Sequence, residues 1–451
     1  MKKTITILDF IFAFIFFVAG CFLLFPIFVT GRIYKWLGLR NFYSKHRLIW
    51  ITSASYQKAV DKGCKWGVLP YHTTFNGYFD KNFIINLTAE KFQVRKISEN
   101  VYFYDYPIIL RKFIVSGNFR YSGIIINVMS TILFFSIFIF LKKVDLVCNG
   151  SAYYNGINTA LFSIISGCPY YFSPGCNYEL DIKINGLPKY MPSEKIVFIT
   201  LKFIVKFAYC FSCIRKDLKE SLVKIGALEK KIKVIYNSID ISLYDRPVDP
   251  SKFSEFSGNY TIVYAGRINR VNVIHHIIMC AELVYKKIPN VKFVILGGPF
   301  GEDDKKYLNE CRIMIKEKKL EEFVFMPGIN YSNDDVSHIK RLCNVNLITM
   351  GGLSLIESAA SKKPVVVYDY DWHSELIKDH FNGILVEYNN YQKMADAIYE
   401  LYSDPELSKS LSEKAYDTVI ERHTIKKEIE NYINFYDSVY EGLKKSEDFS
   451  A

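Results

Sequence analysis

The stretch that most constrains the fold is 344–371, which reads as a strand, a glycine turn, a short helix and a second strand. The apolar-rich run 345–348 stops at the pair Gly351-Gly352. The β-branched run 364–368 is typical of a strand buried in a parallel sheet. Parallel strands need a crossover connection, usually a helix. The sequence therefore predicts a βαβ unit and an α/β fold.

Apolar residues recur at helical spacing between the two predicted strands, so one face of that helix should pack on the sheet: Leu353, Ile356, Ala359 and Ala360. The first amides of a helix have no intrahelical acceptor and lie at the positive end of its dipole. The amides of Gly352, Leu353 and Ser354 are therefore candidates to hold a phosphate, and Glu357 is a candidate to accept hydrogen bonds from sugar hydroxyls. Glycine before a helix is also a common plain turn, and both interpretations stay open at this point.

Several separated motifs follow one another from Asn237 onward: NSIDISLY, IVYAGRI, VKFVILGGP, FVFMPGI, GGLSLIESAASKKPVVVYD and ELIKDHFNGILV. In order and spacing they resemble the C-terminal domain of family-4 glycosyltransferases, across roughly half the chain. The resemblance implies an α/β GT-B fold, in which two Rossmann-like domains face a cleft. It also implies sugar transfer from a nucleotide-diphosphate sugar with retention of configuration, with no cofactor and no bound metal.

The resemblance assigns roles to individual residues. Arg267, in Ala265-Gly266-Arg267, matches the family's phosphate-binding arginine, and Glu357 matches a glutamate that usually contacts the ribose. These two are the catalytic candidates. The binding candidates are residues of the flanking turns and of the loop that faces the base: Gly266, Arg270, Gly328, Ile329, Gly352, Leu353 and Ser354.

Three positions depart from the family pattern. Asn272 stands where the family has a lysine, Thr349 where it has the first glutamate of its motif, and Pro174 where a histidine often lies. Arg270 is a candidate to replace the lost lysine. Nucleotide binding is thus better supported than catalysis, and the alternative is a catalytically silent GT-B protein that binds nucleotide sugar or a partner enzyme.

The segment after the second predicted strand contains further polar residues. Asp369-Tyr370-Asp371 looks like the metal-binding motif of another glycosyltransferase fold, but it ends a buried strand, so we expect no metal there. His373 and Glu375 follow at the rim where α/β proteins bind ligands, and helix capping is their alternative role.

The run 5–30 is long and apolar enough to cross a bilayer, with Asp9 the only charge near its start. A signal peptide is the alternative, but no clear cleavage site follows. The basic residues after the run outnumber Lys2 and Lys3 before it: Arg32, Lys35, Arg40, Lys45 and Arg47. The sequence therefore predicts a single-pass anchor with the catalytic body on the cytoplasmic face.

Two later apolar runs need interpretation. The run 123–141 either spans the membrane, which would make a protein with two spans, or is a helix of an α/β domain docked on the lipid interface. Its immediate passage into a strand start at Val144 favours the docked helix. The run 196–214 is predicted to be a third apolar helix.

The domain organisation follows from these assignments. We expect an anchor over 1–31, an N-terminal Rossmann-like acceptor domain over 32–245, and a nucleotide-sugar domain over 255–424. The Pro-, Asp- and Ser-rich residues 243–258 are the predicted linker. The helix and tail over 425–451 cross back to the N-terminal domain in the resembled family. A polar loop after the first strand is a possible acceptor loop: His72, Thr73, Thr74, Asn76 and Asp80.

Composition bounds the partners. With 451 residues and 50% hydrophobic content the chain is long enough for two domains. The net charge of +11 includes no basic block typical of nucleic-acid binding, and it favours anionic lipid headgroups and phosphorylated substrates. Ten cysteines lack paired spacing, which fits a reducing compartment. The expected partners are a nucleotide-sugar donor, a lipid-linked or glycan acceptor and a membrane, with no nucleic acid.

Overall fold

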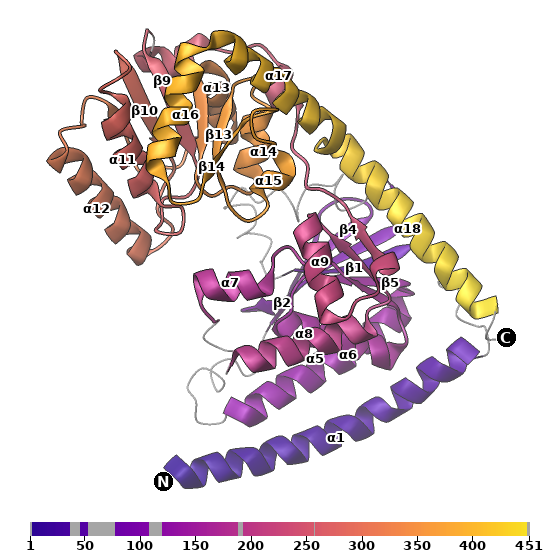
Figure 1. Cartoon of the computed structure of the whole chain (residues 1–451). Helices are drawn as coiled ribbons and strands as arrows, with labels where there is room; N and C mark the ends of the chain where they lie inside the picture. The colour runs from indigo at the N-terminus through magenta and orange to yellow at the C-terminus, as the bar shows by residue number, and fades with distance from the viewer. Residues whose placement is uncertain are drawn as a thin grey trace. The chain divides into compact units, whose positions relative to one another are not determined.

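The computed structural model describes residues 2–36, 46–52, 77–107, 120–187, 193–256 and 258–448. The chain forms two compact units (Figure 1). Unit 1 comprises Met1–Ile235 together with Ile429–Ala451, and unit 2 comprises Tyr236–Glu428. Each unit is built on one sheet, so both have the α/β organisation that the sequence predicts.

The described residues of unit 1 form a sheet of eight strands in the order β3-β4-β2-β1-β5-β6-β7-β8. Neighbouring strands are parallel except for β3, which is antiparallel to β4. The strands are β1 (Arg47–Thr52), β2 (Lys81–Ala89), β3 (Gln93–Lys96), β4 (Val101–Pro107), β5 (Leu146–Asn149), β6 (Tyr170–Phe172), β7 (Cys210–Cys213) and β8 (Ile232–Val234).

Helices pack around this sheet, and α1 packs on two of them, α5 and α6. Among the described residues two helical stretches are long and apolar enough to cross a membrane, Phe12–Thr30 and Ile124–Lys142. The helices are α1 (Lys2–Trp36), α5 (Arg120–Lys142), α6 (Tyr154–Ser166), α7 (Tyr178–Asn185), α8 (Glu194–Phe207), α9 (Lys216–Ile225) and the 3-10 turn η3 (Glu229–Lys231). α5 connects β4 to β5, and its Phe135, Phe138 and Ile139 are buried in the core of unit 1. The second apolar run is therefore a core helix of the α/β unit.

The predicted helix over 196–214 is wrong beyond its first two-thirds. α8 ends at Phe207, Ala208 is extended, and Cys210–Cys213 forms strand β7, buried along its whole length. The amide of Tyr209 already donates to the carbonyl of Tyr170, 2.9 Å away, as the sheet pairing begins. A continuous apolar run fits a buried strand as well as a buried helix, so periodicity alone did not find this boundary.

The last helix, α18 (Ile425–Asp448), packs on unit 1 from Ile429 onward. Its aromatic residues share a core with strands β1, β5 and β6, and the hydroxyl groups of Tyr436 and Tyr171 lie 2.6 Å apart. The Tyr440 hydroxyl donates to Asp145 at 2.8 Å. Asp145 is fully buried, and its carboxylate also accepts the amide of Arg47 at 2.8 Å.

The described residues of unit 2 form a parallel sheet of six strands in the order β11-β10-β9-β12-β13-β14. The strands are β9 (Tyr260–Ala265), β10 (Val291–Leu296), β11 (Val324–Phe325), β12 (Val345–Ile348), β13 (Val365–Asp369) and β14 (Ile384–Glu387). The helices are α10 (Ser242–Asp245), the 3-10 turn η4 (Pro250–Phe256), α11 (Ile274–Val284), α12 (Glu302–Glu317), α13 (Asn333–Leu342), α14 (Leu353–Ala359), α15 (His373–Leu376), α16 (Tyr391–Ser403) and α17 (Pro405–Arg422). The predicted βαβ unit is confirmed as β12-α14-β13, with Ile356 and Ala359 buried.

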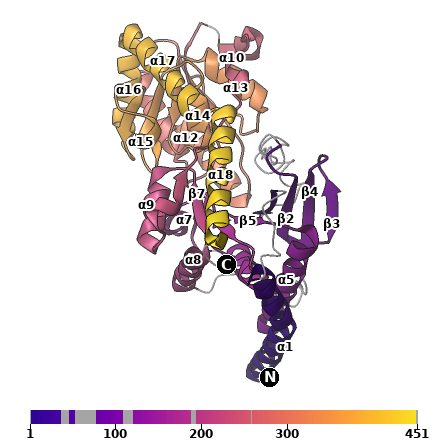
Figure 2. The same cartoon turned by 90° about the vertical axis from the view of Figure 1, so that its right-hand side faces the viewer.

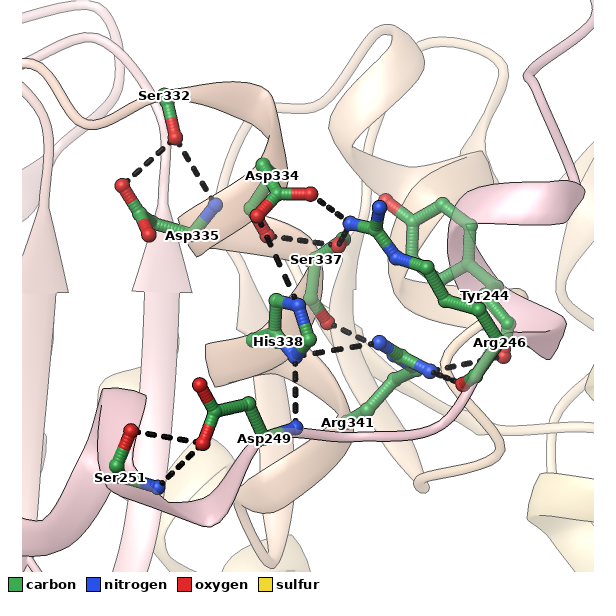
Figure 3. Close-up of polar contacts among 10 residues, drawn as sticks. All are labelled: Tyr244, Arg246, Asp249, Ser251, Ser332, Asp334, Asp335, Ser337, His338 and Arg341. Atoms are coloured by element: carbon green, nitrogen blue, oxygen red, sulfur yellow. Dashed lines mark hydrogen bonds and ion pairs between the residues drawn. The ribbon is translucent and has the colours of Figure 1, made fainter.

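The predicted linker 243–258 lies inside unit 2, because the units meet in the sequence between Ile235 and Tyr236. Polar contacts fasten this segment to α13 (Figure 3). Arg341 donates to the carbonyls of Tyr244 and Arg246, Arg246 pairs with Asp334, and the Asp249 amide donates to His338 at 3.1 Å. Its Pro, Asp and Ser content resembles that of a linker, but three of its backbone groups pair with buried side chains of α13.

Asp145 makes the stability of unit 1 depend on pH. Burial raises the pKa of Asp145 to about 7, although the bonds from Tyr440 and Arg47 oppose that rise. The folded chain then holds a proton that the unfolded chain has lost, so the free energy of unfolding falls as the pH rises from about 4 to about 7.

We expect Asp145→Asn to remove this decline, because asparagine keeps an acceptor for both bonds and carries no charge. The variant should be more stable than the parent by roughly 1–2 kcal/mol at pH 8 and by little at pH 4. Thermal unfolding across this pH range measures the difference. Equal pH profiles for the two proteins would contradict the assignment.

Candidate functional site

The loops at the carboxyl edge of the unit 2 sheet lie close together. A Cβ atom added to Gly297, after β10, would meet the carbonyl oxygen of Gly266, after β9, at 1.8 Å. One added to Gly298 would meet the side chain of Asn330, after β11, at 3.0 Å. The predicted site residues of these loops therefore share one edge of the sheet, where α/β proteins bind ligands.

Ser354 joins the start of α14 to the end of β9. Its hydroxyl donates to the carbonyl of Ala265 at 2.6 Å, directly before Gly266 and Arg267. Gly266 lies close to the Tyr264 hydroxyl, which a Cβ atom would meet at 2.6 Å. The structure thus brings together the glycine after β9 and the first turn of α14.

A buried lysine that the sequence analysis missed lies beneath this turn. Lys340 of α13 is 0% exposed, and its ammonium donates to Glu357 Oε2 at 2.9 Å and to the carbonyl and hydroxyl oxygens of Ser354, each at 3.0 Å. An ammonium has three donors, so every one of them is satisfied. Lys340 therefore holds both Ser354 and Glu357 in place.

Glu357 is the member of this group that is available to a ligand. Its side chain is 28% exposed while that of Lys340 is 1% exposed. Only Oε2 is engaged by Lys340, and Oε1 accepts no hydrogen bond from the residues that the structure describes. An ionised carboxylate oxygen fixed in this way can accept hydrogen bonds from hydroxyl groups.

The glycine turn before α14 is held by the residues that follow β13. His373 is 1% exposed, and its Nδ1 donates to the carbonyl of Tyr368 at 2.8 Å. In the neutral ring its Nε2 accepts from the Gly351 amide at 3.1 Å, and Trp372 donates to the Gly351 carbonyl at 3.0 Å. His373 therefore supports the turn, whereas Glu375 accepts a bond from Tyr236 at 2.8 Å.

Both predicted arginines are held on α12. Arg267 donates twice to Asp304, at 2.8 and 3.0 Å, and lies over the Phe300 ring. Arg270 pairs with Glu310 at 2.5 Å and lies over the Tyr307 ring. The Arg267 side chain is 48% exposed, whereas that of Asp304 is only 14% exposed. An incoming phosphate would compete with Asp304 for Arg267, and Asp304 would keep the Phe300 amide as a donor.

Two of the three departures from the family pattern contact one another. Thr349 is fully buried and donates to the carbonyl of Asn272 at 2.6 Å. Asn272 in turn donates to the carbonyl of Arg267 at 2.6 Å, and Tyr264 donates to the same carbonyl at 3.2 Å. A neutral hydrogen-bonded group thus occupies the two positions where the resemblance leads us to expect charges. Pro174 lies in unit 1, buried after β6.

The remaining candidates of unit 2 lie on the same edge of its sheet, whereas the acceptor-loop candidates lie outside the described residues, except Asp80 of unit 1. Gly328 has a φ of 73°, and a Cβ atom added to it would lie 2.7 Å from the Leu308 side chain. The following Ile329 is 56% exposed. Asp369 is exposed, and no group of three or more His, Cys, Asp or Glu residues suited to a metal occurs within the described ranges. His72, Thr73, Thr74 and Asn76 lie outside the described residues, and Asp80 pairs with Arg47 at 3.0 Å.

This architecture is the GT-B type, in which two units each carry a Rossmann-like sheet. The structure resembles that of Anabaena Alr3699/HepE in complex with UDP and glucose, with a TM-score of 0.64, 15% sequence identity, and coverage of 87% of this chain and 100% of that one. At that identity the likeness shows the fold alone.

Residues 245–418 match the family described as Glycosyl transferases group 1. The chain is 31% identical over 209 residues to the poly(glycerol-phosphate) alpha-glucosyltransferase of Bacillus subtilis (strain 168), covering 46% of this chain and 30% of that protein. It is 34% identical over 164 residues to the poly(ribitol-phosphate) alpha-N-acetylglucosaminyltransferase of Staphylococcus aureus (strain COL), covering 36% and 32%. The chain thus spans about a third of the length of these curated relatives.

We predict that Lys340→Met weakens UDP binding by about tenfold, because Glu357 loses the cation that fixes its position. Calorimetry with UDP measures the effect. Lys318→Met is the matched control, since Lys318 forms a similar pair with Glu282 on the surface of unit 2. The control should bind UDP as the parent does.

Loss of a buried partner can also destabilise the fold by about 3 kcal/mol, so a second variant is needed. In Lys340→Met/Glu357→Gln neither charge is left unpaired, and this variant should fold and bind UDP no more weakly than Glu357→Gln alone. Unchanged UDP affinity in folded Lys340→Met would show that Lys340 does not position the site.

Proposed function

We propose that this protein is a retaining glycosyltransferase of the family-4 type, which transfers a sugar from a nucleotide-diphosphate sugar to a membrane-associated acceptor. One observation carries the proposal: a buried ammonium fixes the Glu357 carboxylate, with one oxygen unpaired among the described residues, beside the glycine turn. A ribose diol supplies the two hydroxyl donors that such an oxygen accepts.

The neighbouring groups suit the diphosphate of the donor. Arg267 lies just after the end of β9, two residues beyond the Ala265 that Ser354 holds, and its 48% exposed side chain is accessible to a phosphate. A guanidinium and the amides at Gly352 and Leu353 can take up the charge that develops on the leaving diphosphate. The reaction proposed here needs no divalent metal.

The acceptor assignment rests on the relatives and on the apolar helices. Names of similar proteins refer to poly(glycerol-phosphate), poly(ribitol-phosphate) and, for a Streptococcus pneumoniae protein 26% identical over 218 residues, alpha-monoglucosyldiacylglycerol. These are phosphate-bearing or lipid molecules. An acceptor of that kind, such as a lipid-linked glycan, suits a chain with a net charge of +11 and exposed phenylalanines on α1. We place the body of the protein on the cytoplasmic face.

A second candidate function is nucleotide-sugar binding without turnover. The neutral group formed by Thr349 and Asn272 favours it, because two charges that the family directs at the donor are absent. A silent binder would show UDP affinity in calorimetry with no sugar transfer and no donor hydrolysis. Turnover therefore separates the two functions.

We expect the protein in detergent or membranes to release UDP from one member of a panel of UDP-sugars, with or without EDTA. Arg267→Ala should lower kcat/KM by about 100-fold, because the leaving diphosphate loses a charged partner. Arg422→Ala, which removes an arginine of similar exposure from the end of α17, is the control and should retain parental turnover. Full activity of Arg267→Ala, or activity that requires added manganese, would contradict the proposed chemistry.

A further inference from the structure

Helix α1 has a specific packing partner, α5. Asp9 of α1 is 2% exposed, and its carboxylate accepts the amide of Ser122 at 2.9 Å and also the Ser122 hydroxyl. Ser122 lies in the first turn of α5, where backbone amides have no helical acceptor and an anion is favoured. An acidic residue in an apolar helix is costly in lipid, and here it caps the neighbouring helix instead.

The two helices continue side by side from this point (Figure 2). Gly20 of α1 faces Met129 of α5, and a Cβ atom at Gly20 would lie 2.8 Å from the Met129 side chain. Leu24 is buried in the same core as Ile132 and Phe135. Since later residues of α1 meet later residues of α5, the helices are parallel. Their apolar stretches, Phe12–Thr30 and Ile124–Lys142, therefore lie along each other.

The position of α5 in the sheet restricts how this pair can meet a membrane. α5 connects β4 to β5, which belong to one sheet with β2 and β1 between them. Phe138 of α5 packs on Phe83 of β2, with ring centroids 5.3 Å apart. An open sheet with polar edges cannot enter the hydrocarbon core of a bilayer. α5 therefore cannot cross a membrane while it lies on this sheet.

We propose that α1 does not span the bilayer but lies along the membrane surface together with α5, with its N-terminus on the same side as the body of unit 1. A spanning α1 would carry the parallel α5 and the sheet into the lipid. This inference replaces the single-pass anchor predicted from the sequence. It concerns only how unit 1 meets the membrane, so its test is independent of the proposed sugar transfer.

The chemistry of the uncovered faces identifies lipid as the occupant. Four large apolar side chains on α1 are 62–76% exposed: Phe14, Phe22, Leu23 and Phe25. Leu141, at the end of α5, is 75% exposed. Asp9, Ala13, Gly20 and Leu24 form a narrow buried stripe along α1. α5 and the core of unit 1 contact only this stripe, so the rest of the apolar surface of α1 is available to lipid. The exposed Lys142 and Lys143 follow at the end of α5, where anionic headgroups would attract them.

Cysteine accessibility in sealed membrane vesicles tests the topology. Lys3→Cys is compared with Lys224→Cys, whose site on α9 of unit 1 is 79% exposed, each in a background without the exposed Cys21. We expect an impermeant maleimide to label both positions in vesicles of one orientation, inverted or right-side-out, and neither position in vesicles of the other orientation. Labelling of the two positions from opposite sides would show that α1 spans the membrane and would overturn the inference.

Cross-linking in the same membranes tests the packing. The pair Asp9→Cys/Ser122→Cys should form a cross-link with a short bifunctional reagent, because the two side chains are in contact. The control pair Phe14→Cys/Ser122→Cys should not, because Phe14 is 68% exposed whereas Asp9 is buried against Ser122. Failure of the first pair to cross-link, or equal cross-linking of both pairs, would show that α1 leaves α5 in the membrane and would also overturn the inference.

Discussion

The candidate site of unit 2 depends on one interaction, the set of three hydrogen bonds from the buried ammonium of Lys340. Without it Glu357 would be a partly buried carboxylate with no cation, and the first turn of α14 would lose the donor that holds Ser354. A buried charge is tolerated only where it is paired and its donors are satisfied, and Lys340 meets both conditions. Ser354 extends the same chain of contacts to Ala265 at the end of β9. Two loops that are separate in the sequence thus become one rigid surface.

Helix α13 has a second role, which explains why its charged residues are buried. Lys340 faces α14, while the adjacent Arg341 donates to carbonyls of the segment that enters unit 2, as Figure 3 shows. His338 and Asp334 hold the same segment. One short helix therefore fixes both residues 244–249 and the carboxylate of the candidate site. A neutral substitution at Lys340 or at Arg341 should therefore change the contacts of the other residue only by displacing α13.

The sequence predicted the elements of the site better than the contacts of their side chains. The βαβ unit followed from a β-branched run, a glycine pair and helical spacing, each of which is a local property. Lys340 could not be found in this way, because a lysine in the last turn of a helix is typical of a solvated surface and only the fold reveals that it is buried. The direction of the Arg267 side chain was equally inaccessible, since it depends on Asp304 in a helix 37 residues further along the chain. The strand β7 was missed because burial on both faces erases the pattern that distinguishes strand from helix.

The proposed contact between Glu357 and the ribose of a nucleotide donor can be tested by removing each partner in turn. Calorimetry would measure the affinity of the parent and of Glu357→Gln for UDP and for 2′,3′-dideoxyuridine diphosphate, which lacks the two ribose hydroxyls. The account predicts that the parent loses about tenfold in affinity when the hydroxyls are removed, and that Glu357→Gln binds both nucleotides with similar, weaker affinity. A Glu357→Gln variant that still discriminates between the two nucleotides by the same factor as the parent would show that this carboxylate does not contact the ribose.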